Sequence, residues 1–187
     1  MAIALTSDPI VAIEDVKAVL NLNDETTAKL LINSVSEKFL RYTERTVLNS
    51  TSVIETLRGD GTGVIWLLNY ASAIASVIIL ANGDASITYD SDDFSFDTVG
   101  RISLHSVTTP LSYDEENVKV TYTGGWATIP GDIVLAALEQ MQVENNRLSG
   151  RGAGISSESF EGHSVSYEQD GIVSSVKDVW RKYKVLR

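Results

Sequence analysis

The chain has 187 residues, of which 43% are hydrophobic and 21% charged, a size and composition typical of one folded domain, or one domain with appendages. Its formal charge of −10, from 25 acidic and 15 basic residues, opposes nucleic-acid binding. The absence of cysteine excludes disulfides, thiolate nucleophiles and thiolate metal sites, and it favours a reducing cytoplasm as the place of synthesis.

Two helices are predicted near the N-terminus, over residues 13–20 and 24–45. The polar residues Asn21 to Asp24 separate them and can cap the second helix. In the second helix, four apolar or aromatic residues recur at offsets of four, four and three and therefore share one face. They are Leu31, Val35, Phe39 and Tyr42. This face is predicted to belong to the core or to an interface.

From about Ser52 the apolar period shifts toward two, which predicts an antiparallel β-rich region of four to six strands over residues 52–123. Two alternating patterns are clearest, in Val64, Trp66 and Leu68 and in Val118, Val120 and Tyr122. Turns with glycines at positive φ are expected at 59–61, 82–84 and 123–125.

The segment from Gly61 to Gly83 contains no charged residue and is long enough to span a bilayer. Its polar residues Asn69, Ser72 and Ser76 and its β-branched residues favour two buried strands instead.

A long helix is predicted over residues 130–147, with Pro130 in its first turn. Residues 133–138 are apolar nearly all round, so this half of the helix is expected to be buried on more than one side, where a neighbouring subunit could supply the second side. The candidate subunit-packing residues are Ile133, Val134, Leu135 and Leu138.

Residues 149–187 are predicted to form a flexible linker followed by a C-terminal docking segment, with β structure over 156–167 and then a short helix. The last eleven residues carry five basic groups and one acidic group, a net charge of +4, whereas residues 1–176 carry ten basic and 24 acidic groups, a net charge of −14. A basic amphipathic helix on an acidic body can dock on an acidic partner or a neighbouring subunit. The alternative is a solubilising helix end whose cations favour the helix dipole.

Aromatic and arginine anchors often dominate interface energies, and they make up most of the predicted interface with a partner or a neighbouring subunit. The candidates are Arg147, Arg151, Tyr167, Val176, Trp180, Arg181, Tyr183 and Arg187. The fold class that emerges is α+β. It comprises an N-terminal helical hairpin, a central antiparallel β-rich region, a long helix after Pro130, and an extended C-terminal tail with a short helix.

No motif predicts an enzyme, a cofactor or a metal site. His105 and His163 lack metal-ligand spacing and are interpreted as surface or turn residues, and no nucleophile elbow is present. The glycine-rich run 59–63 lacks the lysine of a phosphate-binding loop and is interpreted as a hairpin turn. The acidic run 90–97 departs from the calcium-binding EF-hand pattern at Phe94 and Ser95, so a solvated acidic loop is favoured over a cation site.

Several local strings follow one another in a characteristic order along nearly the whole chain. They are Ile13–Lys17, Phe39–Arg45, Gly59–Gly61, Asn82–Asp84, Gly100–Leu104, Val118–Trp126 followed by Ile129–Pro130, and Ser157–Ser159 with Ser164–Tyr167. In this order they resemble the head-tail connector (adaptor) proteins of tailed bacteriophages, of the gp6-like family. The chain departs from that pattern at Asn69–Ser72, where these proteins often carry proline.

The resemblance implies a structural protein of the virion neck, with residues 1–148 as connector body and 149–187 as portal-binding segment. It implies an oligomeric ring, dodecameric in the virion, that joins the portal protein to a stopper or tail-completion protein and is assembled in the bacterial host cytoplasm. DNA is expected to pass through the ring without specific binding, and no membrane is involved. A tail-completion or stopper protein remains an alternative, as does an acidic DNA-mimic inhibitor.

Overall fold

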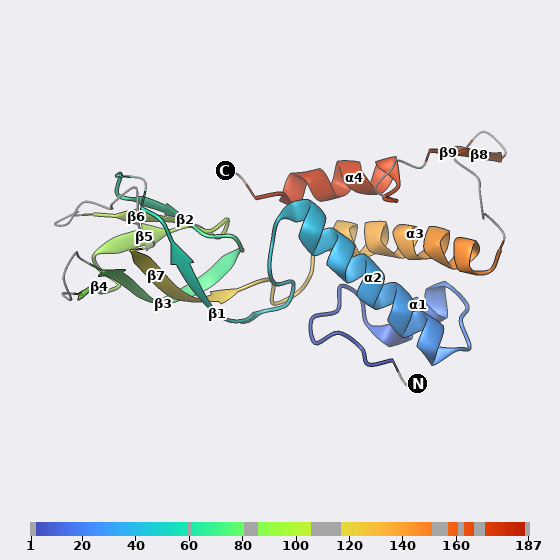
Figure 1. The fold of residues 1–187 in the computed structure, drawn as a ribbon, viewed down its shortest axis with the longest axis horizontal. Coiled ribbons are helices and arrows are strands. Elements are labelled where there is room, and N and C mark those ends of the chain that lie inside the picture. The colour runs from blue at the N-terminus through green and yellow to red at the C-terminus, as the bar shows by residue number, and fades with distance from the viewer. Residues whose placement is uncertain are drawn as a thin grey trace. The chain divides into compact units, whose positions relative to one another are not determined.

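The computed structural model describes residues 3–59, 61–80, 86–105, 117–150 and 171–185, with the backbone alone at 157–160 and 163–166. The chain divides into two compact units, whose elements are labelled in Figure 1. The helical unit comprises Met1–Leu48 and Thr128–Leu186, and the β unit comprises Asn49–Ala127. The fold is α+β, as predicted. The β region forms a unit of its own, and the C-terminal helix belongs to the helical unit.

The helical unit contains helices α1, Ile13–Val19, α2, Glu25–Thr43, α3, Gly131–Leu148, and α4, Ser174–Trp180, followed by the 3-10 turn η1, Arg181–Tyr183. Helix α1 begins at residue 13, as predicted, and α2 begins one residue after the predicted start at residue 24. Asp24 caps α2, because its carboxylate accepts the backbone N–H groups of Thr26 and Thr27 at 3.2 and 2.9 Å. The helix ends at Thr43, and its C-cap residue Glu44 has a φ of +61°.

The predicted apolar face of α2 lies in the core of the helical unit. Leu31, Val35 and Phe39 are fully buried, and Tyr42 is half-buried. Ile133, Ala137 and Met141 of α3 are also buried, at spacings of four that keep them on one side of that helix. The prediction for α2 is confirmed.

Helix α3 begins one residue after Pro130, whereas the sequence predicts Pro130 itself to lie in the first turn. Its backbone is extended, with φ −54° and ψ 136°, so it is the N-cap residue of α3 and not its first helical residue. The proline thus sets the entry of the chain into the helix, and Gly131 opens the first turn.

In the described residues of the β unit, seven strands form two antiparallel sheets. The larger sheet has the order β1-β7-β3-β4, from Thr51–Leu57, Val118–Gly124, Ala71–Leu80 and Ser86–Tyr89, and the smaller has the order β2-β6-β5, from Val64–Trp66, Arg101–Leu104 and Phe94–Phe96. Seven described strands exceed the four to six predicted, because two of the seven contain only three residues and carry too little pattern to be counted.

The two sheets share one core, to which β2, β3, β4, β5, β6 and β7 contribute buried residues. Val118, Val120 and Tyr122 all belong to it, as their alternation predicts. The side of β2 that carries Val64 and Trp66 is the less buried one, since Ile65 and Leu67 are buried and Trp66 is 45% exposed. Both phases of this strand are apolar, so alternation alone could not select the inner one.

The glycine-rich run 59–63 connects β1 to β2, which lie in different sheets. It is therefore not the hairpin turn that was predicted, although Gly61 has the expected positive φ of +75°. Gly125 likewise has a φ of +85°, and residues 82–84 lie outside the described residues.

The apolar segment from Gly61 to Gly83 contains β2 and β3, which confirms the prediction of two strands. Within the described part of the chain, no helix has both the length and the apolar content needed to cross a bilayer. Between α3 and α4, strands β8, Ser157–Phe160, and β9, His163–Ser166, pair as an antiparallel hairpin where one stretch of β structure was predicted.

Candidate assembly surfaces

The C-terminal helix α4 is anchored inside the helical unit by Trp180. The indole is fully buried and meets the ring of Phe39 edge-on, with 5.3 Å between ring centroids. The centroid of the Tyr42 ring also lies close, at 6.2 Å, and Val176 is buried one turn earlier. Trp180 and Val176 are thus core residues of this unit in the described structure.

Hydrogen bonds to the backbone hold both ends of this C-terminal segment. Before α4, the buried amide of Gln140 donates to the carbonyl of Gly171 at 2.8 Å and accepts the N–H of Val173 at 3.0 Å. After α4, the guanidinium of Arg45 donates to the carbonyl of Tyr183 at 2.8 Å. The N–H of Val185 donates to the carbonyl of Thr43 at 2.9 Å. The segment from Gly171 to Val185 is therefore integrated into the helical unit at several points.

The remaining predicted interface residues differ in their accessibility. Arg181 is exposed and pairs with Asp178 at 3.3 Å. Tyr183 is half-buried and donates its hydroxyl to Asp132 at 2.7 Å, and Arg147 is half-buried on α3. Arg151, Tyr167 and Arg187 lie outside the described residues.

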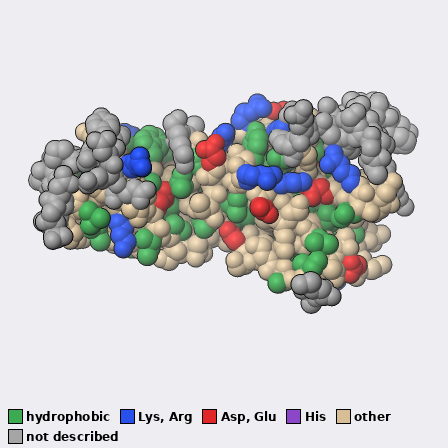
Figure 2. Space-filling view, in the orientation of Figure 1, with side chains coloured by type: hydrophobic (Ala, Val, Ile, Leu, Met, Phe, Trp, Pro, Cys, Tyr) green, Lys and Arg blue, Asp and Glu red, His purple; other side chains and the backbone are tan. Residues whose placement is uncertain are grey.

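The exposed cations of the C-terminal segment are Arg181, Lys182 and Lys184. Lys184 pairs with Glu44 at 3.0 Å. In the space-filling view of Figure 2, blue Lys and Arg side chains gather on the helical unit in the region of α4 and the adjacent end of α2. This basic surface is available to a partner, whereas Trp180 beneath it holds α4 in place.

The predicted subunit-packing residues of α3 divide into an inner and an outer set. Ile133 is buried by its own unit, and Val134 and Leu138 are half-buried. Leu135 is 69% exposed. One side of the helix is thus covered by this chain, and Leu135 faces outward on another side. Any contact that buries Leu135 must come from elsewhere.

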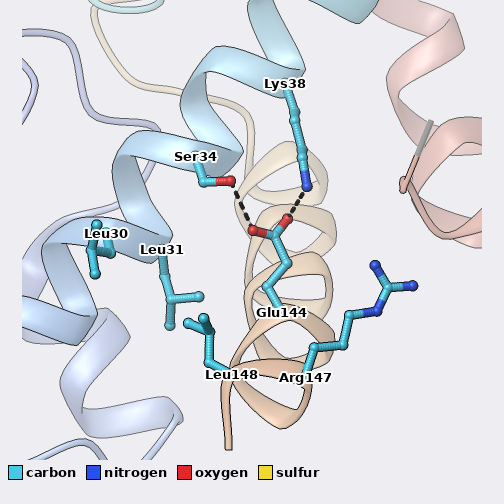
Figure 3. A pocket seen from close by; sticks show the side chains of 7 residues that line it. All are labelled: Leu30, Leu31, Ser34, Lys38, Glu144, Arg147 and Leu148. Carbon is cyan, nitrogen blue, oxygen red and sulfur yellow. Dashed lines mark hydrogen bonds and ion pairs between the residues drawn. The ribbon is translucent and has the colours of Figure 1, made fainter. Parts of the chain in front are cut away.

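A groove with a volume of 430 Å³ lies between α2 and α3 (Figure 3). Its apolar end is formed by Leu30, Leu31 and Leu148, of which Leu30 is 44% and Leu148 65% exposed. Its polar end contains Ser34, Lys38, Glu144 and Arg147. Figure 3 shows the leucines of the two helices facing one another at one end, with the carboxylate of Glu144 at the other.

Glu144 organises the polar end of this groove. Its carboxylate accepts the hydroxyl of Ser34 at 2.8 Å and the ammonium of Lys38 at 2.6 Å, and it also accepts the amide of Gln140 at 3.0 Å. The two charged side chains are largely buried, with 20% of Lys38 and 12% of Glu144 exposed. A partly buried ion pair with added hydrogen bonds is held in a defined geometry, and it fixes α2 against α3.

Gln140 and Glu144 were not among the residues predicted from the sequence to form a site. Both lie on the apolar stripe of α3, since Ile133, Ala137, Gln140, Met141 and Glu144 follow helical spacing. Polar residues that occupy positions of a buried stripe are expected to have hydrogen-bond partners. Extending the stripe beyond Leu138 would have identified them.

The β unit contains a buried polar network centred on Tyr122. The tyrosine hydroxyl donates to Glu55 at 2.7 Å and accepts the amide of Asn69 at 2.9 Å. The carboxylate of Glu55 also accepts the N–H of Leu68. Burial, more than the neighbouring carboxylate, raises the pKa of Tyr122 well above its usual range. The network ties the β2–β3 connection to β1 and β7.

The acidic run 90–97 and His105, which were considered as metal-binding motifs, make local hydrogen bonds. The N–H of Asp90 donates to the carboxylate of Asp93 at 2.9 Å, and the N–H of Arg101 donates to that of Asp97 at the same distance. The ring nitrogen Nδ1 of His105 lies 3.0 Å from the carbonyl of Asp92. Within the described ranges, no three His, Asp or Glu side chains form a group that could hold a metal ion.

Comparison with known proteins gives a match in structure alone. No protein-family model matches the chain, and no curated protein matches its sequence. The fold is similar to a chain in the neck of an empty gene transfer agent (GTA) particle computed with C6 symmetry, at a TM-score of 0.61 and 12% identity. A chain in the neck of the native GTA particle, computed with C12 symmetry, gives a TM-score of 0.60 at 13% identity. Both comparisons cover 100% of this chain and 96% of the other.

Proposed function

We propose that this protein is a structural subunit of the neck of a phage-like particle, where it acts as a head-tail adaptor. The observation that carries the proposal is the shared fold with both GTA neck chains, which extends over the whole of this chain. The order of sequence strings that resembles phage connectors points independently to the same class of protein.

The proposed assembly is a closed homo-oligomeric ring, dodecameric in the virion. The neck structures with which the fold is shared were computed with C6 and C12 symmetry, and identical subunits in rotational symmetry form rings through repeated contacts. The exposed Leu135 on α3 offers an apolar contact for such a ring.

The basic surface of Arg181, Lys182 and Lys184 is the proposed contact with the portal protein. Its charge is opposite to that of residues 1–176, so it can be attracted to an acidic partner surface. Trp180 and Val176 support this contact from inside the helical unit and do not touch the partner in the described state.

The acidic charge of the chain suits a ring through which DNA passes. A wall with a net negative charge repels phosphates, so a duplex can slide through it without specific binding. On this proposal the protein belongs to the virion neck, and it is assembled in the cytoplasm of the bacterial host.

The proposal is tested by removing the gene from the phage-like element and examining the particles by electron microscopy. An adaptor is required for joining, so we expect DNA-filled heads and separate tails, with joining restored by the wild-type protein. Labelled protein should be found at the neck of complete particles. Normal joined particles in the deletion strain would refute the proposal.

A binding assay with purified proteins separates the adaptor from its alternatives. An adaptor binds portal rings directly, whereas a stopper or tail-completion protein requires the adaptor to be present. An acidic DNA mimic would instead protect DNA in restriction digests to which purified protein is added. Binding to portal alone, without protection of DNA, is the result expected for this chain.

A further inference from the structure

Trp66 and Arg101 form an exposed aromatic and cationic pair on the smaller sheet of the β unit. They lie directly opposite one another in the register of β2 and β6, and the guanidinium carbon of Arg101 lies 5.8 Å from the centre of the Trp66 ring. That separation is within the range of a cation–π contact. Trp66 is 45% exposed, and Arg101 is also exposed. We call these two residues the β2–β6 platform.

The guanidinium of Arg101 pairs with no carboxylate among the described residues. Asp97 is the closest acidic residue in sequence, but its carboxylate accepts the backbone N–H of Arg101 at 2.9 Å and forms no ion pair with the side chain. Stacking on Trp66 covers one face of the guanidinium and leaves the N–H groups at its edge for an acceptor. The platform thus presents free donors on a chain whose net charge is −10.

The backbone beneath the platform is held in one conformation. In the turn between β5 and β6, the N–H of Gly100 donates to the carbonyl of Asp97 at 3.2 Å, and the N–H of Leu67 donates to the carbonyl of Gly100 at 2.8 Å. Gly100 has a φ of +95°, and a Cβ at this position would lie 2.6 Å from the carbonyl oxygen of Asn69, so the turn requires glycine. A contact on such a fixed backbone loses less conformational entropy when a partner binds.

The composition of the sheet face around the platform distinguishes between two kinds of partner. Val64 and Ser103 are paired two residues further along β2 and β6, and Ser95 lies opposite Ser103 on β5, so all three share the face of the platform. Permanent contacts between identical subunits are more apolar than this. Contacts between separately folded proteins are as polar as the general surface and are enriched in tryptophan and arginine. The face therefore favours a separate protein over a neighbouring copy.

We propose that the β2–β6 platform binds an acidic segment of another protein of the particle, with a carboxylate on Arg101 and an apolar or aromatic group on Trp66. A carboxylate can accept two parallel hydrogen bonds from one guanidinium. A nucleic acid is a less suitable ligand, because the net charge of −10 repels a polyanion. The inference rests on the proposed function and adds a second contact to it: the basic surface of the helical unit is proposed for the portal, and the platform for the next protein of the neck.

Substitutions in the platform test it in particles made by the phage-like element. Arg101→Glu and Trp66→Ala should leave the protein on the heads but reduce the number of joined particles about tenfold or more, because anchors of this kind carry much of an interface energy. Arg101→Lys keeps the charge but not the bidentate geometry, so its effect should be smaller. The matched control is Lys119→Glu, which makes the same change of charge at an exposed position of the larger sheet and should join normally.

Photocrosslinking identifies the molecule that lies on the platform. The photoreactive amino acid p-benzoylphenylalanine replaces Ser103, complete particles are irradiated, and the products are identified by mass spectrometry. We expect a product with a different particle protein, joined at a segment that contains Asp or Glu. A product of two copies of this chain would overturn the proposal in favour of a ring contact, and so would the absence of any product. The same amino acid at Lys119 should not give the product seen at Ser103.

An exchange of charges then tests the ion pair itself. The partner's acidic residue nearest the crosslink is changed to Lys and combined with Arg101→Glu. The restored attraction should recover part of the joining that Arg101→Glu alone has lost, and no recovery would overturn the assignment of a carboxylate to Arg101. Nucleic acid is tested separately by fluorescence anisotropy with a short labelled DNA duplex. Binding should be weak and equal in wild type and Arg101→Glu, and binding that the substitution abolishes would overturn the proposal.

The two proposals fail in different ways. If the wild-type protein is absent from heads and from complete particles, the neck function is wrong. If the wild-type protein is found at the neck but Arg101→Glu joins heads to tails as well as the wild type does, the neck function stands and the platform does not bind the next protein.

Discussion

Tyr122 connects three polar groups in the interior of the β unit. Replacing it with Phe removes the hydroxyl that donates to Glu55 and accepts from Asn69, and both partners are buried. The loss of hydrogen bonds at buried polar groups costs about 1–3 kcal/mol, so the free energy of unfolding should fall by that amount. Urea unfolding measures the change. Lys119→Ala, on the exposed side of the same strand, should change it by less than about 0.5 kcal/mol.

The same tyrosine predicts a stability change in alkali. Burial raises the pKa of Tyr122 in the folded protein, whereas the unfolded chain loses this proton near pH ~10. The folded state therefore holds the proton longer, and its stability falls as the pH rises above about 10. Unfolding free energies measured between mildly and strongly alkaline pH should decrease less steeply for Tyr122→Phe than for the wild type. Equal slopes would argue against the buried, protonated hydroxyl.

Asp24 predicts the opposite pH dependence in the helical unit. Hydrogen bonds from Thr27, and then Thr26, lower the pKa of this carboxyl in the folded state. Its stabilising effect is therefore present above the unfolded pKa of about 4 and is lost as the pH falls through the folded value. Asp24→Ala should lower the melting temperature at neutral pH and have little effect in strong acid. Asp24→Asn can still cap the helix, so its effect at neutral pH should be smaller.

At the scale of single residues, the sequence predicted apolar burial better than polar burial. Leu31, Val35 and Phe39 were identified because helical spacing alone places them on one face. Gln140 and Glu55 were not identified, because a polar residue is buried only where another part of the chain supplies its hydrogen bonds. That partner is fixed by tertiary structure, not by the local pattern.

Helix α4 depends on one large side chain for its position. Trp180→Ala removes the indole that packs against Phe39 and Tyr42, and loss of a buried aromatic side chain costs about 3–5 kcal/mol. We expect amide hydrogens of Ser174–Trp180 to exchange faster in the variant, as measured by mass spectrometry. Arg181→Ala, which changes an exposed neighbour, is the control and should leave exchange unchanged. Unchanged exchange in Trp180→Ala would show that the backbone bonds alone hold the helix.

At the scale of elements, the starts of the helices were predicted closely because caps and helical periodicity are local. Sheet order was not predicted, since the pairing of β1 with β7 joins residues far apart in sequence. The amphipathic pattern of α4 was interpreted as a docking surface for a partner. An apolar stripe has the same spacing whether its own chain or another chain covers it, and only the fold shows that Phe39 lies against Trp180.

The whole molecule consists of a helical unit into whose sequence the β unit is inserted. The chain enters and leaves the β unit at neighbouring points, because Asn49 and Trp126 form a β-bridge and the N–H of Ser50 donates to the carbonyl of Trp126 at 2.9 Å. Replacing Asn49–Ala127 with a short glycine-serine linker should therefore leave a folded helical unit. Circular dichroism and the fluorescence of the buried Trp180 would report it.

The excised β unit should fold as well, because it has its own two sheets and a shared core. The dispersion of amide signals in an NMR spectrum of residues 49–127 alone measures this. An unfolded spectrum for either piece would show that the two units stabilise one another.

The insertion also determines the order in which the chain can fold during its synthesis. The apolar face of α2 packs against α4 through Phe39 and Trp180, and α2 is bonded to α3 through Lys38 and Glu144. Both α3 and α4 leave the ribosome after the complete β unit. Domains generally fold as units while the chain emerges. The β unit is thus the first of the two units that can fold completely. The N-terminal helices keep an uncovered apolar face until α3 and α4 have been synthesised. Chaperones that bind such surfaces would act in that interval.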